Sequence, residues 1–188
     1  WESPWWPILM GVEHERIHLE TSSVLIRQHA LEFVQPHPDW QPCRKSATAP
    51  HNTLVNVAAG AITTGKNKTG HKHYGWDNEY GLRSADISAF QASKYLVSNQ
   101  EFLSFVETNG YRTESYWQEE GLSWQKFTQA EHPTFWVKKG DTWYLRLMTE
   151  EIPMPWDWPV EVNYHEAKAF CNWKSAMTKQ PVRLPTED

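Results

Sequence analysis

Two histidines near the start of the chain have the spacing of a metal site. His14 and His18 belong to the run Gly11-Val-Glu-His-Glu-Arg-Ile-His-Leu-Glu20. On a helix, side chains four residues apart project from the same face, one turn from each other. Two imidazoles on one face can each give a nitrogen to a single metal ion. Such pairs also arise by chance in a chain with nine histidines, so a pair without a metal role stays open.

The same residues also spell the H-E-x-x-H pattern of zinc proteases. In that reading Glu15 would activate a zinc-bound water. The extended form of the pattern requires Gly at position 21 and His at position 24, where this chain has Thr21 and Val24. The other form needs a Glu on a second helix, and a proline-rich segment follows here instead. A zinc protease is therefore the less supported alternative.

The histidines lie in a segment, Pro4 to Phe33, that predicts a single helix. Ser3 suits the N-cap and Pro4 suits the first helical position. Apolar residues occur on more than one face, which indicates a helix buried among other helices. An uncommitted imidazole is costly in such surroundings. Because residue 1 is Trp rather than Met, we expect an internal fragment whose partner helices lie upstream.

The rest of the chain predicts a linker and an α+β domain. Four prolines between residues 35 and 52 break regular structure and indicate an extended linker. Short strands and capped helices then alternate with Trp-rich loops, which is typical of an α+β domain over residues 53–188. The predicted elements are a strand or hairpin at 53–64, a strand at 92–97, a helix opened by Ser98 and Glu101, a hairpin around Gly140, and a helix from Asn163 to about Met177.

Composition excludes several function classes. The net charge of −5 and the lack of a basic stripe argue against a nucleic-acid partner. No apolar run reaches the roughly 20 residues of a membrane span. Only two cysteines, Cys43 and Cys171, are present, which favours a reducing, cytoplasmic location. The acids Asp77, Glu79 and Asp157 lie in turn-rich segments, where we expect them to fix loop backbone. Trp-rich loops also suit a non-catalytic, lectin-like binding module.

Several segments resemble one enzyme family. Residues 13–28 resemble the iron-binding helix of ovothiol synthases (5-histidylcysteine sulfoxide synthases), whose H-x3-H-x-E motif is met by His14, His18 and Glu20. That helix belongs to a DinB-like four-helix domain. Residues 75–81, 94–102, 153–160 and 182–187 resemble the formylglycine-generating-enzyme-like (sulfatase-modifying factor, C-type-lectin-like) domain that follows it. The resemblance implies the last DinB-like helix in 1–34, a linker in 35–52, and the N-terminal half of the second domain in 53–188.

The resemblance also implies a cofactor, substrates and roles. Three histidines would hold iron(II), with His14 and His18 as two of them and the third on an earlier helix. The family reaction joins the sulfur of cysteine to a carbon of the histidine imidazole and forms a sulfoxide, using O2. Glu20 would steady a metal ligand or a neighbouring basic group, and the catalytic tyrosine would lie outside this chain. In the sister family, which makes ergothioneine from trimethylated histidine, a Gln precedes the second helix ligand; Ile17 stands here and favours the ovothiol branch.

Overall fold

The computed structural model describes residues 3–69 and 74–187 as a mixed helical and β structure, which confirms the α+β class. The helices, 3-10 turns and strands are, in chain order, α1 (Trp6–Arg27), η1 (Leu31–Phe33), β1 (Leu54–Val57), β2 (Gly60–Lys66), η2 (Asp77–Glu79), β3 (Gly81–Ile87), β4 (Phe90–Ser93), α2 (Asn99–Glu107), η3 (Glu114–Tyr116), α3 (Glu119–Thr128), β5 (Trp136–Lys139), β6 (Thr142–Arg146), β7 (Glu151–Pro153) and α4 (Tyr164–Thr178).

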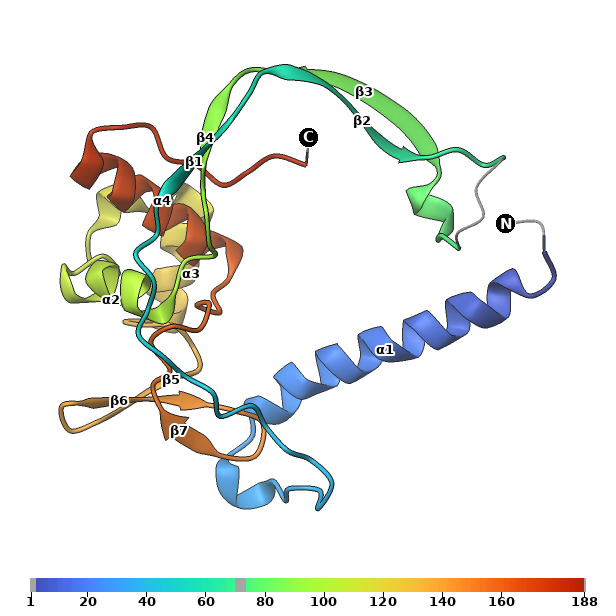
Figure 1. Cartoon of the computed structure of the whole chain (residues 1–188). Helices are drawn as coiled ribbons and strands as arrows, with labels where there is room; N and C mark the ends of the chain where they lie inside the picture. The colour runs from blue at the N-terminus through green and yellow to red at the C-terminus, as the bar shows by residue number, and fades with distance from the viewer. Residues whose placement is uncertain (1–2, 70–73, 188) are drawn as a thin grey trace.

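The core lies between helices α2, α3 and α4 and the small sheet β5–β6–β7, a unit called the body below (Figure 1). Its centre is aromatic: the ring of Phe102 stacks on Phe170 at 5.2 Å, and Phe105 meets Trp173 edge to face at 5.8 Å. Burying several aromatic rings in one cluster gives a short chain much of its hydrophobic stabilisation. Many of the chain's tryptophans therefore serve packing.

Local caps fix the helices of the body where the sequence predicts them. The Ser98 hydroxyl accepts the backbone N–H of Glu101 at 3.2 Å and starts α2. Asn163 and Glu166 form the reciprocal capping box that starts α4. The hairpin of β5 and β6 turns at Gly140, whose φ of +58° favours glycine. These predictions are confirmed.

A two-stranded ribbon extends from the body. β1 pairs with β4 and β2 pairs with β3, both antiparallel, so residues 54–66 form one leg and 81–93 form the other. The segment 53–64, predicted as a strand or hairpin, is thus two strands that pair with a distant segment rather than with each other. The strand predicted at 92–97 begins and ends earlier, as β4. Figure 1 shows the ribbon arching from the body toward the N-terminal end of α1.

Helix α1 is shorter than predicted. It begins at Trp6, with Trp5 rather than Ser3 at the N-cap, and it ends at Arg27. Residues 31–33 form a separate 3-10 turn. No residue of α1 is buried by the described part of the chain. Leu19, for example, is 74% exposed. The described residues do not supply the helical partners that the apolar pattern predicts, and the DinB-like assignment stays a prediction.

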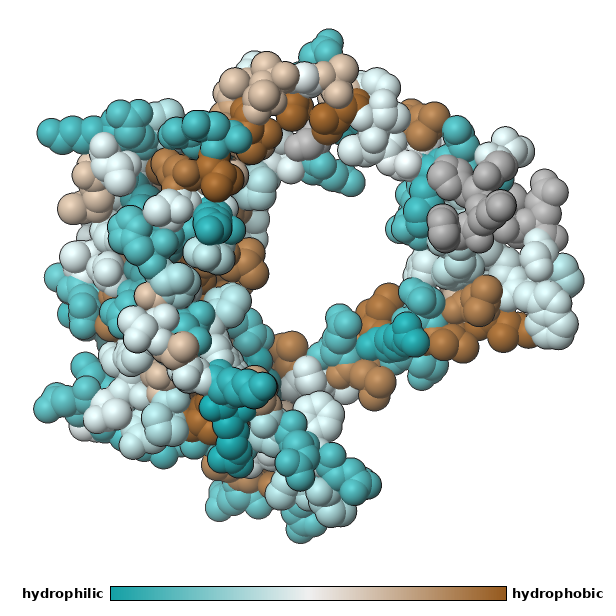
Figure 2. All heavy atoms as spheres, viewed as in Figure 1, coloured by the Kyte–Doolittle hydropathy of each residue, from teal (hydrophilic) through white to brown (hydrophobic). Residues whose placement is uncertain are grey.

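Both ends of α1 are attached to the rest of the molecule. At the N-terminal end the indole N–H of Trp6 donates to the Gly75 carbonyl at 2.7 Å, near the tip of the ribbon. At the C-terminal end Arg27 donates to the Arg146 carbonyl at 3.0 Å. Body, ribbon and α1 therefore enclose an open centre, and Figure 2 shows apolar side chains along α1.

Besides the short 3-10 turns, one helix and two strands are absent from the sequence prediction: α3, β3 and β7. Helix α3 has no side-chain N-cap, so its start has no local signal. β3 depends on a partner outside its own segment, since it pairs with β2 across residues 67–80, whereas β7 is a three-residue strand that pairs with the neighbouring β6 across residues 147–150. None of the helices in the described ranges combines the length and apolarity needed to cross a bilayer.

Candidate functional site

The imidazoles of His14 and His18 lie together on the exposed surface of α1. Their ring centroids are 4.5 Å apart and the rings meet edge to face at 85°. Within the described ranges neither ring has a hydrogen-bond partner among the protein's groups. The helix therefore holds two imidazoles side by side, as the spacing predicts. Both histidines are exposed on the described chain, and the prediction that helices outside this chain bury α1 stays a prediction.

The pair fits part of an iron site. Two neighbouring imidazoles without hydrogen-bond partners offer two of the three nitrogen ligands that the resemblance implies. Within residues 3–69 and 74–187 no group of three His, Cys, Asp or Glu side chains is placed to hold a metal ion. The chemistry of the donors is therefore suitable, and a third ligand is not among the described residues. His71 and His73 lie outside those residues.

A cavity of about 470 Å³ opens between α1 and the segment that carries η2. We call it the seam cavity. Trp76 links it to the histidines, since its ring lies 6.5 Å from that of His14. The cavity is lined by Glu13, Arg16, Ile17, Glu20, Trp76, Asn78 and Glu79. A ligand held by the pair would thus border Trp76 and the cavity.

Hydrogen bonds fix Trp76 in this place. The backbone N–H of Trp76 donates to the Glu79 carboxylate at 2.6 Å, and Trp6 holds the preceding carbonyl of Gly75. Lys66 in turn donates to Glu79 at 2.9 Å. The hydrogen bond from Lys66 has the largest effect in holding the pKa of Glu79 below its ordinary value, and the bond from the Trp76 backbone lowers that pKa further. The prediction that Glu79 fixes loop backbone is confirmed, and this fixing positions the indole.

Glu20 lies on the wall of the seam cavity and not beside the imidazoles. Residues two apart on a helix leave it on nearly opposite sides, so Glu20 and His18 point in different directions. No hydrogen bond joins Glu20 to either histidine in the described ranges. Its role in steadying a ligand stays a prediction. Ile17 lines the same cavity and is 46% exposed.

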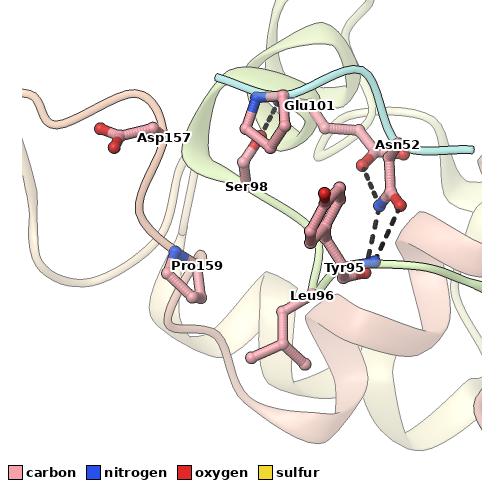
Figure 3. Close-up of a pocket in the computed structure, with 8 residues that line it drawn as sticks. Asn52, Tyr95, Leu96, Ser98, Glu101, Asp157 and Pro159 are labelled. Atoms are coloured by element: carbon pink, nitrogen blue, oxygen red, sulfur yellow. Dashed lines mark hydrogen bonds between the residues drawn. The ribbon is translucent and has the colours of Figure 1, made fainter. Parts of the chain in front are cut away.

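A second cavity, of about 270 Å³, lies on the body (Figure 3). Its polar groups are satisfied by one another: the Asn52 amide donates to the Tyr95 carbonyl and to Glu101. Lys174 completes the cluster with a 2.7 Å bond to Glu101. Nearby, the Ser46 hydroxyl donates to Asp157 at 2.6 Å, and the Ala47 backbone N–H also donates to this carboxylate, so Asp157 fixes linker backbone as predicted. These contacts attach the linker to the body.

The cysteines show no sign of catalytic work. Cys171 is buried, and burial raises the pKa of its thiol, as suits a small core residue. Cys43 is an exposed free thiol in the linker. No pattern in the sequence indicates a role for Trp76, because its contact with His14 depends on how the ribbon tip meets α1.

Residues 41–188 match the model of the sulfatase-modifying factor enzyme 1-like domain. The chain belongs to this family. The match covers the body and the ribbon and begins inside the predicted linker. The sulfatase-modifying factor domain therefore carries Trp76 and one wall of the seam cavity, whereas α1 with its two histidines precedes the match.

Curated relatives of this sulfatase-modifying factor chain include oxygenases. It is 34% identical over 112 residues to hercynine oxygenase of Mycobacterium tuberculosis, covering 59% of this chain and 24% of that protein. It is 27% identical over 191 residues to hercynine oxygenase of Mycolicibacterium smegmatis, covering 99% of this chain and 41% of that protein. It is 30% identical over 109 residues to ergothioneine biosynthesis protein 1 of Neurospora crassa, covering 53% of this chain and 12% of that protein. The chain spans less than half the length of these relatives.

Proposed function

We propose that this chain is part of a non-haem iron(II), O2-dependent sulfoxide synthase that joins a cysteine sulfur to an imidazole carbon of a histidine derivative. The observation that carries the proposal is the pair of imidazoles, 4.5 Å apart, next to Trp76 of the sulfatase-modifying factor domain. The alignment with the Mycolicibacterium smegmatis hercynine oxygenase supports it, because it covers 99% of the chain and so extends over α1.

The overall reaction balances with O2 as the oxidant. A thiol and an imidazole each give up one hydrogen as the C–S bond forms, and the sulfur gains one oxygen atom. The other oxygen atom leaves as water, so O2 accepts four electrons. Iron(II), held by His14, His18 and a third ligand, would supply the open coordination positions and electron transfer that such chemistry needs.

The chain's own residues would bind and orient the substrates. The thiolate is the form of cysteine that binds metals, so the donor would lie against the histidine pair. The acceptor would then reach past Trp76 into the seam cavity, whose charged lining suits an amino acid. Holding both reactants in one geometry contributes much of the rate gain of a two-substrate enzyme.

Trimethylated histidine is the acceptor that the relatives favour. Two of them are named for hercynine and one for ergothioneine biosynthesis, so the ergothioneine branch has more support than the ovothiol branch that the sequence pattern favours. Ile17 supports histidine itself as a second candidate acceptor, because an apolar side chain lines the cavity where the sister family has Gln.

Oxygen uptake by the full-length protein tests both candidates. The protein would be loaded with iron(II) and given a cysteine-containing thiol with either trimethylated histidine or histidine. We expect oxygen uptake and a C–S-linked sulfoxide, detected by mass spectrometry, with the trimethylated acceptor. Product from histidine alone would support the ovothiol branch. No oxygen uptake with either acceptor, or cleavage of a peptide instead, would contradict the proposal.

A further inference from the structure

Aromatic contacts, rather than hydrogen bonds, hold the ring of His14. A metal-binding histidine usually donates its second ring N–H to a carboxylate or a carbonyl, and this bond sets the orientation of the ring. Within residues 3–69 and 74–187 no protein group makes such a bond to His14. Its ring instead lies 4.5 Å from that of His18 and 6.5 Å from that of Trp76, with 35° between the planes of His14 and Trp76. The orientation of His14 therefore depends on its two aromatic neighbours.

The backbone of Trp76 is fixed on both sides of its indole. Its N–H donates to the Glu79 carboxylate at 2.6 Å, and its carbonyl accepts the backbone N–H of Glu79 at 3.1 Å. Lys66, at the end of β2, donates to the same carboxylate at 2.9 Å and to the Tyr74 carbonyl at 3.3 Å. The indole thus projects from a backbone that the ribbon itself holds in place.

The ribbon tip also contacts α1 at a second point. The indole N–H of Trp6 donates to the Gly75 carbonyl at 2.7 Å, and the rings of Trp6 and Tyr74 lie 6.2 Å apart. Trp6 is eight residues before His14, which is about 12 Å along a helix axis. Two contacts separated in this way restrain the tip from rotating about either one. Trp76 therefore has a defined place relative to His14.

We propose that Trp76 is a positioning residue for His14, whose ring it restrains in the orientation that lets His14 and His18 serve one metal ion. The inference rests on the proposed function for the identity of that metal. A ligand held in place before the metal arrives loses less conformational freedom on binding, so the affinity for the metal is higher. The sulfatase-modifying factor domain would in this way contribute to a metal site whose two histidines precede residue 41, where the match to that domain begins.

Nuclear magnetic resonance of the metal-free, full-length protein tests the ring contact without iron. The histidine rings would be labelled with carbon-13, and the two resonances assigned from His14→Ala and His18→Ala. Because an aromatic ring shifts the resonances of a group held against it, we expect Trp76→Leu to shift those of His14 and to make that ring more mobile. Trp76→Phe should retain most of the wild-type behaviour. His18 should change less, since it has no ring contact with Trp76 among the described residues.

Iron(II) titration of the same variants connects the ring contact to the metal. We expect Trp76→Leu to bind iron(II) roughly 2- to 10-fold more weakly than the wild type, as loss of an aromatic pair does. Trp76→Phe should bind it nearly as the wild type does. Trp40→Leu is the matched control, because Trp40 is an exposed linker tryptophan. It should leave the His14 resonances and the iron affinity unchanged.

The outcomes separate the positioning role from the proposed function. Unchanged His14 resonances in Trp76→Leu would overturn the positioning role, even with weaker iron binding, because Trp76 would then act on the fold and not on the ring. An unchanged iron affinity in Trp76→Leu would also overturn it. Both results leave the proposed function standing as long as the wild type binds iron(II). A wild type that binds no iron(II) would contradict the proposed function and the positioning role together.

Discussion

Arg27 and Arg146 each donate to the backbone carbonyl of the other. The Nε of Arg27 lies 3.0 Å from the Arg146 carbonyl, and the Nε of Arg146 lies 3.4 Å from the Arg27 carbonyl. Arg146 is only 6% exposed, and it also donates to His29 at 3.2 Å. Its charge thus lies at the negative end of α1, where a cation is favourable. This reciprocal contact joins the helix of the histidine pair to the body.

Replacement of Arg146 by Lys should loosen that joint. A lysine ammonium cannot match the planar fork that bonds two carbonyls at once. We expect a loss of about 1–3 kcal/mol in the free energy of attaching α1, because hydrogen bonds from a charged group are lost. Hydrogen exchange should show faster exchange of the last turn of α1. Arg44→Lys is the control, since Arg44 is exposed where it pairs with Glu150 and this pair should contribute little. Equal exchange in both variants would contradict the account.

Tyr111 should stabilise the body through Glu166. The Tyr111 hydroxyl donates to the Glu166 carboxylate at 2.5 Å, and Glu166 is 2% exposed. Burial raises the pKa of Glu166, while Tyr111 and the Asn163 N–H lower it. Since the folded chain holds this proton more tightly than the unfolded chain, stability should fall as pH rises from the ordinary carboxyl value through the raised pKa.

Unfolding at several pH values checks this pH dependence. Tyr111→Phe should cost about 1–3 kcal/mol at pH values above the raised pKa of Glu166, where a carboxylate loses its donor, and less at lower pH. Glu166→Gln should flatten this part of the pH dependence, because the titrating group is gone. A loss in Tyr111→Phe that does not change with pH would show that Tyr111 contributes through packing alone.

Gly110 should not tolerate a side chain. A Cβ there would overlap the ring of Phe105 and would lie 2.6 Å from the Phe105 carbonyl oxygen. Phe105 is fully buried, so it cannot move aside easily. We expect Gly110→Ala to cost about 1–3 kcal/mol in the free energy of unfolding, measured with urea. Gly60→Ala, with nothing within 4 Å, should stay within about 0.5 kcal/mol of the wild type. Equal stability of the two variants would contradict the packing described for Gly110.

The sequence predicts best what a few neighbouring residues decide. Ser98 and Asn163 cap their helices through side chains that lie within one turn, and Gly140 supplies its turn by its own backbone freedom. The end of α1 is different. The helix ends at Arg27, whose backbone carbonyl accepts a hydrogen bond from Arg146. Arg146 lies far along the chain, so no local sequence pattern reveals this contact.

The candidate site also has one part that the local sequence predicts and one part that depends on the tertiary fold. His14 and His18 could be placed side by side from helical spacing alone, and the structure does so. Trp76 could not be linked to them, because that contact depends on the ribbon bringing residues 75–79 to α1. Ile17 predicts the ovothiol branch, and the relatives favour the ergothioneine branch instead.

Iron content of the full-length protein tests the central claim most directly. Purified His14→Ala and His18→Ala variants would be loaded with iron(II), desalted, and analysed for metal beside the wild type. His51→Ala, in the exposed linker, is the control. The account predicts that both helix variants lose most of their iron while the control keeps it, with circular dichroism unchanged in all three. Wild-type iron content in His14→Ala and His18→Ala would contradict it.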